Sequence, residues 1–567
     1  MQCVKLSVTV GARLRHKYGA KLKQIEAARK AWIEANDKND ICTVHVEVDS
    51  SRAMKKYGMA PVKLVDGKAA PPDIKRAIDA LWKRLKPDYL VLFGGCDIVP
   101  MFKVDNPFDD SPGDDHRLAS HSDLFELQEK VPTDNPYASS LPFHASDRKS
   151  YLVPDRVIGR IPDRVGDANP AWLCRYLNTA KNWEPQPVSR YREAYAICSY
   201  QSRRAADKCM KYIARPDSKL LVSPRIKDNW TSAHHRLSAR LHVIKCHGSP
   251  GTPKVYGEKS DYLPDALKTD TLRTYLKPAT VVGTTCCYGA QIFSPAQAVD
   301  AKSKAVAIAE HVKPTQGGWP LASTYLRDGA LGFVGPTVTA YAGDSEMMYA
   351  DWIVAGYLNS ILGGASIGRA FLETKQDYSR WTLQQGQAHG LMESMTLIEY
   401  VLLGDPSITP VTYQLKELGG EIILDAEERR QRRVALLAEE RRQRRVVRVQ
   451  MAREIRKLLP EPLRVTPTQR ARAQKLFTKA QATPTMKEDI KRFKRFAIKP
   501  TAVRVERLHT TFRGPAAQNA AITCRESVEY YWSGQRVSSD GQKRICLLKA
   551  ETDANGKLWR TEVIRSS

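Results

Sequence analysis

Two short apolar stretches near the middle of the chain each end in a side chain that can take part in nucleophilic catalysis. Residues 241–246 (LHVIKC) lead into His247, and residues 279–284 (ATVVGT) lead, after one threonine, into Cys286 and Cys287. A thiol becomes an effective nucleophile when a nearby imidazole accepts or balances its proton. The pattern therefore predicts that His247 and one of the two cysteines form a catalytic dyad.

The two stretches have the character of buried parallel strands, because each is short, rich in β-branched residues and soon followed by glycine. In an open α/β sheet, the chemistry lies just beyond the carboxyl ends of the strands. Two such strand ends would bring an imidazole and a thiol together. Successive residues of a strand point to opposite sides, so only one of Cys286 and Cys287 can face His247.

Two other interpretations of these residues stay open. Cysteine is among the most buried residue types, so the thiols could be core residues beside a satisfied histidine. The joint occurrence of both strand ends favours the dyad over that reading. Cys246, His247, Cys286 and Cys287 are also possible zinc ligands. However, neighbouring side chains on a strand diverge, whereas structural zinc sites space their ligands two or more residues apart, so we expect no metal site.

The His-Gly strand end, followed by a cysteine–glycine strand end, resembles the caspase-like cysteine peptidases. Gingipains are the most similar members, because their catalytic domain also fits residues 87–100 (PDYLVLFGGCDIVP), 156–164 (RVIGRIPDR) and 401–410 (VLLGDPSITP). The resemblance covers residues 1–415. It implies a cysteine endopeptidase that hydrolyses peptide bonds of a protein substrate and needs no cofactor. A second His-Gly pair, His389-Gly390, stands in a helix-like polar context, and we do not expect it to be catalytic.

The resemblance also implies roles for single residues. A caspase-like Cys-x-Gly pattern selects Cys287 as the nucleophile, and a gingipain-like or legumain-like Cys-x-x-Gly pattern selects Cys286. We favour Cys287 and keep Cys286 as the alternative. The thiolate would attack the peptide carbonyl, while His247 would protonate the leaving amine and then activate water. The backbone N–H groups of Gly248 and of the nucleophile are the expected oxyanion donors.

Two segments are expected to line the substrate pocket. In the caspase-like fold the loop after a strand such as 194–200 contributes to this pocket, which would give Arg203 and Asp207 a substrate-binding role. Tyr341 and Asp344 would form another wall. An exposed helix start explains the first pair equally well, and helix capping explains Asp344 equally well.

The chain up to about residue 415 alternates strands with helices. Strands are expected at 5–10, 42–49 and 89–95, and helices at 12–37 and 71–86. This rhythm predicts an α/β fold with a caspase-like, mostly parallel sheet flanked by helices on both faces. Residues 389–404 (HGLMESMTLIEYVLLG) are expected to form one helix.

Residues 103–150 break the rhythm and are expected to form an insertion on the rim of the sheet. Four of its acidic residues could attract calcium, namely Asp109, Asp110, Asp114 and Asp115. They lack the spacing of an EF-hand loop, so a solvated acidic loop is the preferred interpretation.

The composition changes after residue 415. Residues 416–500 are expected to form a basic helical segment and linker, in which AEERRQRRV at 426–434 recurs at 438–446. If the pocket is acidic, this arginine-rich segment is a plausible self-cleavage site. Residues 501–567 contain strand-like stretches and the hairpin signal Asn555-Gly556, which predict a small β-rich C-terminal domain.

The composition of the 567-residue chain sets its charge and compartment. It carries 89 Lys and Arg against 62 Asp and Glu, a net charge of +27, so we expect the basic tail to recruit an acidic protein partner, with nucleic acid as the second choice. Eleven scattered cysteines, no apolar run long enough for a bilayer and no signal peptide favour a reduced, cytoplasmic protein without membrane contact.

The alternative function is a degenerate peptidase fold that serves as a scaffold.

Overall fold

The computed structural model describes most of the chain. The described residues are 3–107, 130–213, 219–224, 234–249, 252–259, 263–292, 320–384, 391–412, 446–457, 501–512, 522–537, 543–553 and 558–566.

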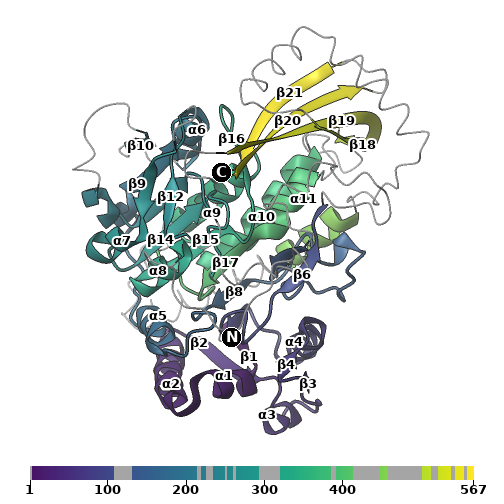
Figure 1. Cartoon of the computed structure of the whole chain (residues 1–567). Coiled ribbons are helices and arrows are strands. Elements are labelled where there is room, and N and C mark those ends of the chain that lie inside the picture. The colour runs from purple at the N-terminus through teal and green to yellow at the C-terminus, as the bar shows by residue number, and fades with distance from the viewer. Residues whose placement is uncertain are drawn as a thin grey trace, which may run out of the picture.

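A ten-stranded sheet forms the centre of the molecule (Figure 1). Its strands, in spatial order, are β10 (Leu220–Ser223), β9 (Ala194–Ser199), β11 (Leu241–Lys245), β14 (Thr280–Thr284), β15 (Ala330–Pro336), β17 (Tyr400–Gly404), β8 (Ile158–Ile161), β5 (Tyr89–Phe93), β1 (Cys3–Thr9) and β2 (Ile41–Glu47). Every neighbouring pair is parallel except β15 and β17. The sheet therefore consists of two parallel halves that run in opposite directions and meet at one antiparallel pair.

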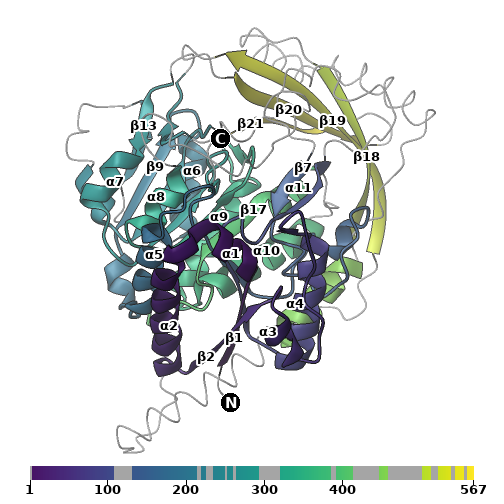
Figure 2. The ribbon, with the colours of Figure 1, turned by 60° about the horizontal axis from the view of Figure 1, so that its bottom comes forward.

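Helices cover both faces of this sheet, which confirms the predicted fold class. One layer contains α2 (Leu22–Lys38), α5 (Ala171–Lys181), α7 (Thr269–Tyr275) and α8 (Leu321–Arg327). The other contains α4 (Pro71–Leu85), α6 (Arg203–Tyr212), α9 (Ala350–Leu362) and α10 (Ile367–Gln384). Figure 2 shows α2 and α4 on opposite sides of β1. Because both faces are covered, strands such as β5 (YLVLF) are apolar throughout and buried at every position.

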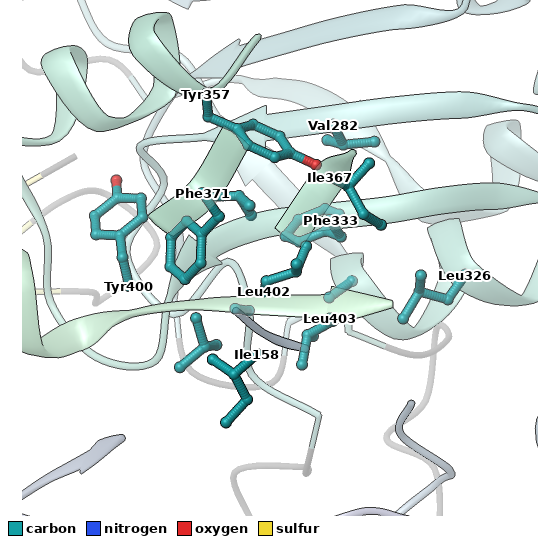
Figure 3. Close-up of a cluster of buried hydrophobic side chains, with 14 of the residues drawn as sticks. Ile158, Val282, Leu326, Phe333, Tyr357, Ile367, Phe371, Tyr400, Leu402 and Leu403 are labelled. Atoms are coloured by element: carbon teal, nitrogen blue, oxygen red, sulfur yellow. The ribbon is translucent and has the colours of Figure 1, made fainter. Parts of the chain in front are cut away.

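The junction of the two half-sheets holds a dense apolar cluster (Figure 3). Phe333 of β15, Leu402 of β17 and Ile158 of β8 are buried there, together with Ile367 of α10. The prediction of a single helix over 389–404 is wrong for its last five residues, 400–404. Helix α11 (Leu391–Glu399) ends before Tyr400, and the apolar run YVLLG continues as the buried strand β17.

Two short strands flank the acidic part of the predicted insertion. They are β6 (Phe102–Asp105) and β7 (Lys130–Thr133), which pair antiparallel. The chain after β7 packs on the core, because the Thr133 hydroxyl donates to the Ile398 carbonyl at 2.7 Å and the Asn135 amide donates to the Leu397 carbonyl at 2.8 Å. The four acidic residues considered for calcium lie outside the described residues.

A second sheet is built from the C-terminal part of the chain and one short strand of the first domain (Figures 1 and 2). Its order is β16 (Tyr341–Gly343), β21 (Leu558–Ser566), β20 (Lys543–Asp553), β19 (Ile522–Val537) and β18 (Thr501–Phe512), all antiparallel. β20 and β21 pair on either side of the predicted Asn555-Gly556 hairpin, whose own residues lie outside the described part.

One stretch of the basic segment is helical and docks on the first domain. Residues 446–457 form a helix in which Arg456 is buried and donates to Asp155 Oδ2 at 2.9 Å and to the Val153 carbonyl at 2.6 Å. Arg448 donates to Asp377 Oδ1 at 2.7 Å. The carboxylates bound by these two arginines therefore belong to the chain itself. Most of the repeated arginine blocks lie outside the described residues.

Candidate active site

The strands that precede His247 and Cys287 are direct neighbours. β11 and β14 pair parallel, and their last matched residues are Ile244 and Thr284. His247 and Cys287 each lie three positions beyond these partners, since 247 − 244 and 287 − 284 are both 3. The strand register therefore brings the two residues out at the same height above the carboxyl end of the sheet.

Gly248 makes the contact between the two strand ends. A Cβ built on Gly248 would lie 1.9 Å from the Cys287 carbonyl oxygen and 3.1 Å from the Cys287 nitrogen. Only a residue without a side chain can bring the backbone of one strand end this close to the other. Packing against Cys287 thus requires glycine at position 248, in addition to the expected role of its N–H as a donor.

The two adjacent cysteines point into different surroundings. The Cys287 sulfur lies 3.3 Å from the Ala340 nitrogen and 3.6 Å from the Ala340 carbonyl oxygen, directly before β16. The Cys286 sulfur lies 3.7 Å from the Ile244 carbonyl oxygen, back against β11. Cys286 therefore faces the sheet interior, and Cys287 faces the segment that was expected to bind substrate.

The turn that carries Cys287 is held in a strained conformation. Tyr288 has a φ of +57°, a left-handed backbone that L-residues with large side chains seldom adopt. Its N–H donates to the Val338 carbonyl at 2.9 Å, and the Ala290 N–H donates to the Pro336 carbonyl at 2.9 Å. The segment after β15 thus fixes the turn, and with it the direction of the Cys287 side chain.

His247 has an acidic partner that sequence reasoning missed. Its Nε2 lies 2.8 Å from Glu258 Oε2, and both side chains are buried. The chain reaches Glu258 because β12 (Lys254–Tyr256) folds back on the strand end, where the main chains of His247 and Tyr256 exchange two hydrogen bonds of 2.8 Å. The polar loop sequence around Glu258 gave no periodic signal for this return.

The backbone around Glu258 is itself tied to neighbouring strand ends. The Glu258 N–H donates to the Ser223 carbonyl at 3.1 Å, at the end of β10, and its carbonyl accepts from the Gln201 N–H at 3.3 Å. Because the main chain of Glu258 is held from both sides, its carboxylate has a fixed base from which to orient the imidazole ring.

The four residues expected to bind substrate come from two segments that touch. The Ala205 N–H at the start of α6 donates to the Asp344 carbonyl at 3.2 Å, and Tyr341 is buried in β16. Arg203 stacks on the Tyr200 ring at 4.2 Å, whereas Asp207 is exposed and pairs with Lys211 of its own helix at 2.8 Å. The structure thus brings the Arg203 and Asp344 segments together, while the Asp207 charge is engaged along α6.

A buried ion pair supports β16. Lys245 Nζ, at the end of β11, lies 2.5 Å from Asp351 Oδ1, and both side chains are buried. The other carboxylate oxygen of Asp351 accepts from the N–H groups of Gly343 at 2.9 Å and of Met348 at 3.1 Å. The strand that leads to His247 is therefore connected through one carboxylate to the strand beside Cys287.

The described residues bear on the metal interpretation in two ways. Among them, no group of three or more His, Cys, Asp and Glu side chains lies close enough to hold an ion. Burial and the neighbouring Cys286 raise the pKa of Cys246 well above its ordinary value, so this sulfur keeps its proton. A zinc ion bound here would have to displace that proton. The His389-Gly390 pair lies outside the described residues.

A cavity of about 890 Å³ lies away from the carboxyl end of the sheet. Pro278, Ala279 and Gly329 line that cavity, at the amino ends of β14 and β15. It is therefore at the opposite end of β14 from Cys287. Within the described part of the chain, no helix combines the length and the apolar character that a membrane span requires.

Comparisons with known proteins add one structural similarity. No protein-family model matches the chain, and no curated protein matches it in sequence. A solved structure described as "Structure of Protease" aligns with 99% of this chain and 97% of its own, at 11% sequence identity and a TM-score of 0.44. With a similarity this low, the function rests on the geometry of the site.

Proposed function

We propose that the chain is a cysteine endopeptidase in which Cys287 is the nucleophile and His247 carries the proton. The observation that supports this most is the equal offset of the two residues beyond the paired strands, with Gly248 packed against the Cys287 carbonyl. The direction of the Cys287 sulfur toward Ala340, away from the sheet interior, favours it over Cys286.

The site residues then divide the work of acyl transfer. Glu258 holds Nε2 of His247, so proton exchange with the thiol falls to Nδ1. The Cys287 thiolate attacks the peptide carbonyl carbon, and the N–H groups of Gly248 and Cys287 stabilise the oxyanion. The imidazolium gives its proton to the leaving amine as the C–N bond breaks. Water, deprotonated by the same imidazole, then hydrolyses the thioester and restores the thiol.

Glu258 acts in this scheme as a positioning residue. Its carboxylate fixes the tautomer and ring orientation of His247 and stabilises the imidazolium. Arg203, Tyr341 and Asp344 line the approach to Cys287 and contact the residues before the scissile bond. Asp207, farther along α6, contributes charge at the edge of this approach.

The test is covalent labelling of the full chain. A mixture of tripeptidyl vinyl sulfones with Arg, Lys, Asp, Asn or Leu next to the reactive group should modify Cys287, as read by peptide mass spectrometry. The Cys286→Ala chain should be labelled to the same extent, whereas Cys287→Ala and His247→Ala chains should not be labelled. Labelling that persists in the Cys287→Ala chain and is lost in the Cys286→Ala chain would assign Cys286 as the nucleophile. A folded chain in which neither cysteine reacts would instead be the degenerate scaffold.

A further inference from the structure

The strand beside the nucleophile is already paired with another strand of the same chain. β16 follows Ala340 directly and forms the edge of the C-terminal sheet, where β21 lies against it (Figure 1). The pairing is antiparallel and covers all of β16. The matched residues are Tyr341 with Ser566, Ala342 with Arg565 and Gly343 with Ile564.

This pairing gives β21 the polarity of a bound substrate. β21 runs from Ile564 to Ser566 toward Tyr341, and Tyr341 is the residue after Ala340, whose nitrogen lies 3.3 Å from the Cys287 sulfur. An extended peptide that presents its carbonyl to Cys287 and pairs antiparallel with β16 runs in the same direction. β21 therefore covers the backbone groups that the residues before a scissile bond would use.

The opposite edge of β16 is engaged by its own domain. Ala342 forms a bridge with Tyr349, and the Gly343 N–H donates to Asp351 Oδ2 at 2.9 Å. A Cβ at Gly343 would lie 1.8 Å from the Glu346 carbonyl oxygen, so the following turn presses on that strand. A substrate strand can thus pair with β16 only on the edge that β21 covers.

Separation of β21 from β16 would leave the rest of the C-terminal sheet intact. β21 pairs with β20 from Arg565 back to Leu558, and β20 pairs in turn with β19. Only three residue pairs hold the four C-terminal strands to β16. The pairing of β21 with β16 is therefore a short contact at one edge of a single sheet, and its opening would leave the pairing of β18 to β21 in place.

We propose that β21 is an autoinhibitory strand, which must leave β16 before a peptide can reach Cys287. This proposal rests on the proposed peptidase function. Substrate and β21 compete for the same strand edge. The apparent affinity for substrate is therefore the intrinsic affinity multiplied by the fraction of chains in which that edge is open.

Hydrogen exchange on the full chain tests the displacement directly. The chain is modified at Cys287 with the tripeptidyl vinyl sulfones, or with iodoacetamide as a probe too small to cover β16. The peptidyl adduct should speed amide exchange in residues 564–566, which pair with β16, and the iodoacetamide adduct should not. Unchanged exchange in a chain fully modified by the peptidyl probe would overturn the proposal.

A pair of proline variants tests the effect on rate. Ile564 pairs with both β16 and β20, whereas Thr561 pairs with β20 alone. Ile564→Pro should raise kcat/KM for peptides about tenfold, whereas Thr561→Pro should leave it unchanged. Equal rates in Ile564→Pro and wild type, or an equal rise in both proline variants, would show that the pairing of β21 with β16 does not limit access to Cys287. If neither wild type nor Ile564→Pro reacts with any peptidyl probe, the peptidase function itself fails.

Discussion

Gly248 lies against the backbone of Cys287 so closely that a single methyl group on Gly248 would fall 1.9 Å from the Cys287 carbonyl oxygen. Both atoms belong to the main chain or are fixed to it, so neither can rotate away. The distance between the two strand ends is therefore set by the absence of a side chain at this one position.

Replacement of Gly248 by alanine should separate the strand ends and abolish the proposed peptidase activity. A displacement of about 1 Å between reacting groups can lower a rate by about a hundredfold, and we expect at least that loss in kcat/KM. Gly363→Ala is the matched control, because a Cβ there meets nothing closer than 3.3 Å. Peptide hydrolysis by both variants is the measurement, and full activity in Gly248→Ala would contradict the contact.

Replacement of Glu258 by glutamine should impair the histidine without removing a hydrogen-bonding group. The amide can donate to Nε2 and place the ring proton on Nδ1, so we expect kcat/KM to fall by about a hundredfold. Without the carboxylate the imidazolium loses its proton more easily, so the alkaline limb of the pH–rate profile should move to lower pH. Asp265→Asn, on the exposed side of the same hairpin, should change neither quantity. An unaltered profile in Glu258→Gln would remove its positioning role.

A buried histidine outside the site should make the fold sensitive to acid. Burial lowers the pKa of His242 from 6.5 to about 4, where its ring contacts the Tyr325 hydroxyl at 2.8 Å and the Ala239 carbonyl at 2.9 Å. The unfolded chain binds this proton first as pH falls, so stability is complete above 6.5 and declines between 6.5 and about 4. The shift corresponds to roughly 3 kcal/mol.

Urea denaturation across this pH range measures that effect. In the His242→Gln chain, the slope of the unfolding free energy against pH between pH 6.5 and 4 should be smaller by the equivalent of about one bound proton. This holds whatever the substitution does to stability at neutral pH. His144→Gln, at an exposed position, should leave the slope as it is in the wild type. Identical slopes in His242→Gln and wild type would show that His242 does not titrate in this range.

The candidate dyad could be proposed from the sequence because it depends on local features. The short apolar strands that lead to His247 and Cys287 could be recognised from a few residues each. The antiparallel pairing of β15 with β17, at which the sheet changes direction, could not be recognised in this way. The run YVLLG at 400–404 continues the apolar pattern of α11, and a run this short does not show whether it forms a strand or a helix. The direction of β17 depends on its neighbours rather than on its own residues.

The features that surround the site depend on long-range contacts. Glu258 reaches His247 only because the Tyr256 main chain bridges back to the strand end, and no spacing rule predicts that return. Tyr341 was expected to line a pocket, but its pairing with Ser566 joins residues more than two hundred positions apart. Arg456 was part of the expected basic helical segment and linker, and composition cannot reveal the buried Asp155 that binds it.

The docked helix at 446–457 changes what a cut in the preceding segment would do. Arg456 anchors that helix to the first domain through Asp155, and β21 holds the C-terminal sheet at β16. A chain severed anywhere between residues 413 and 445 would therefore stay together as a two-chain particle held by non-covalent contacts. Proteolytic nicking would appear on a denaturing gel but not in the native mass, and β21 would still lie beside β16 after the covalent link is lost.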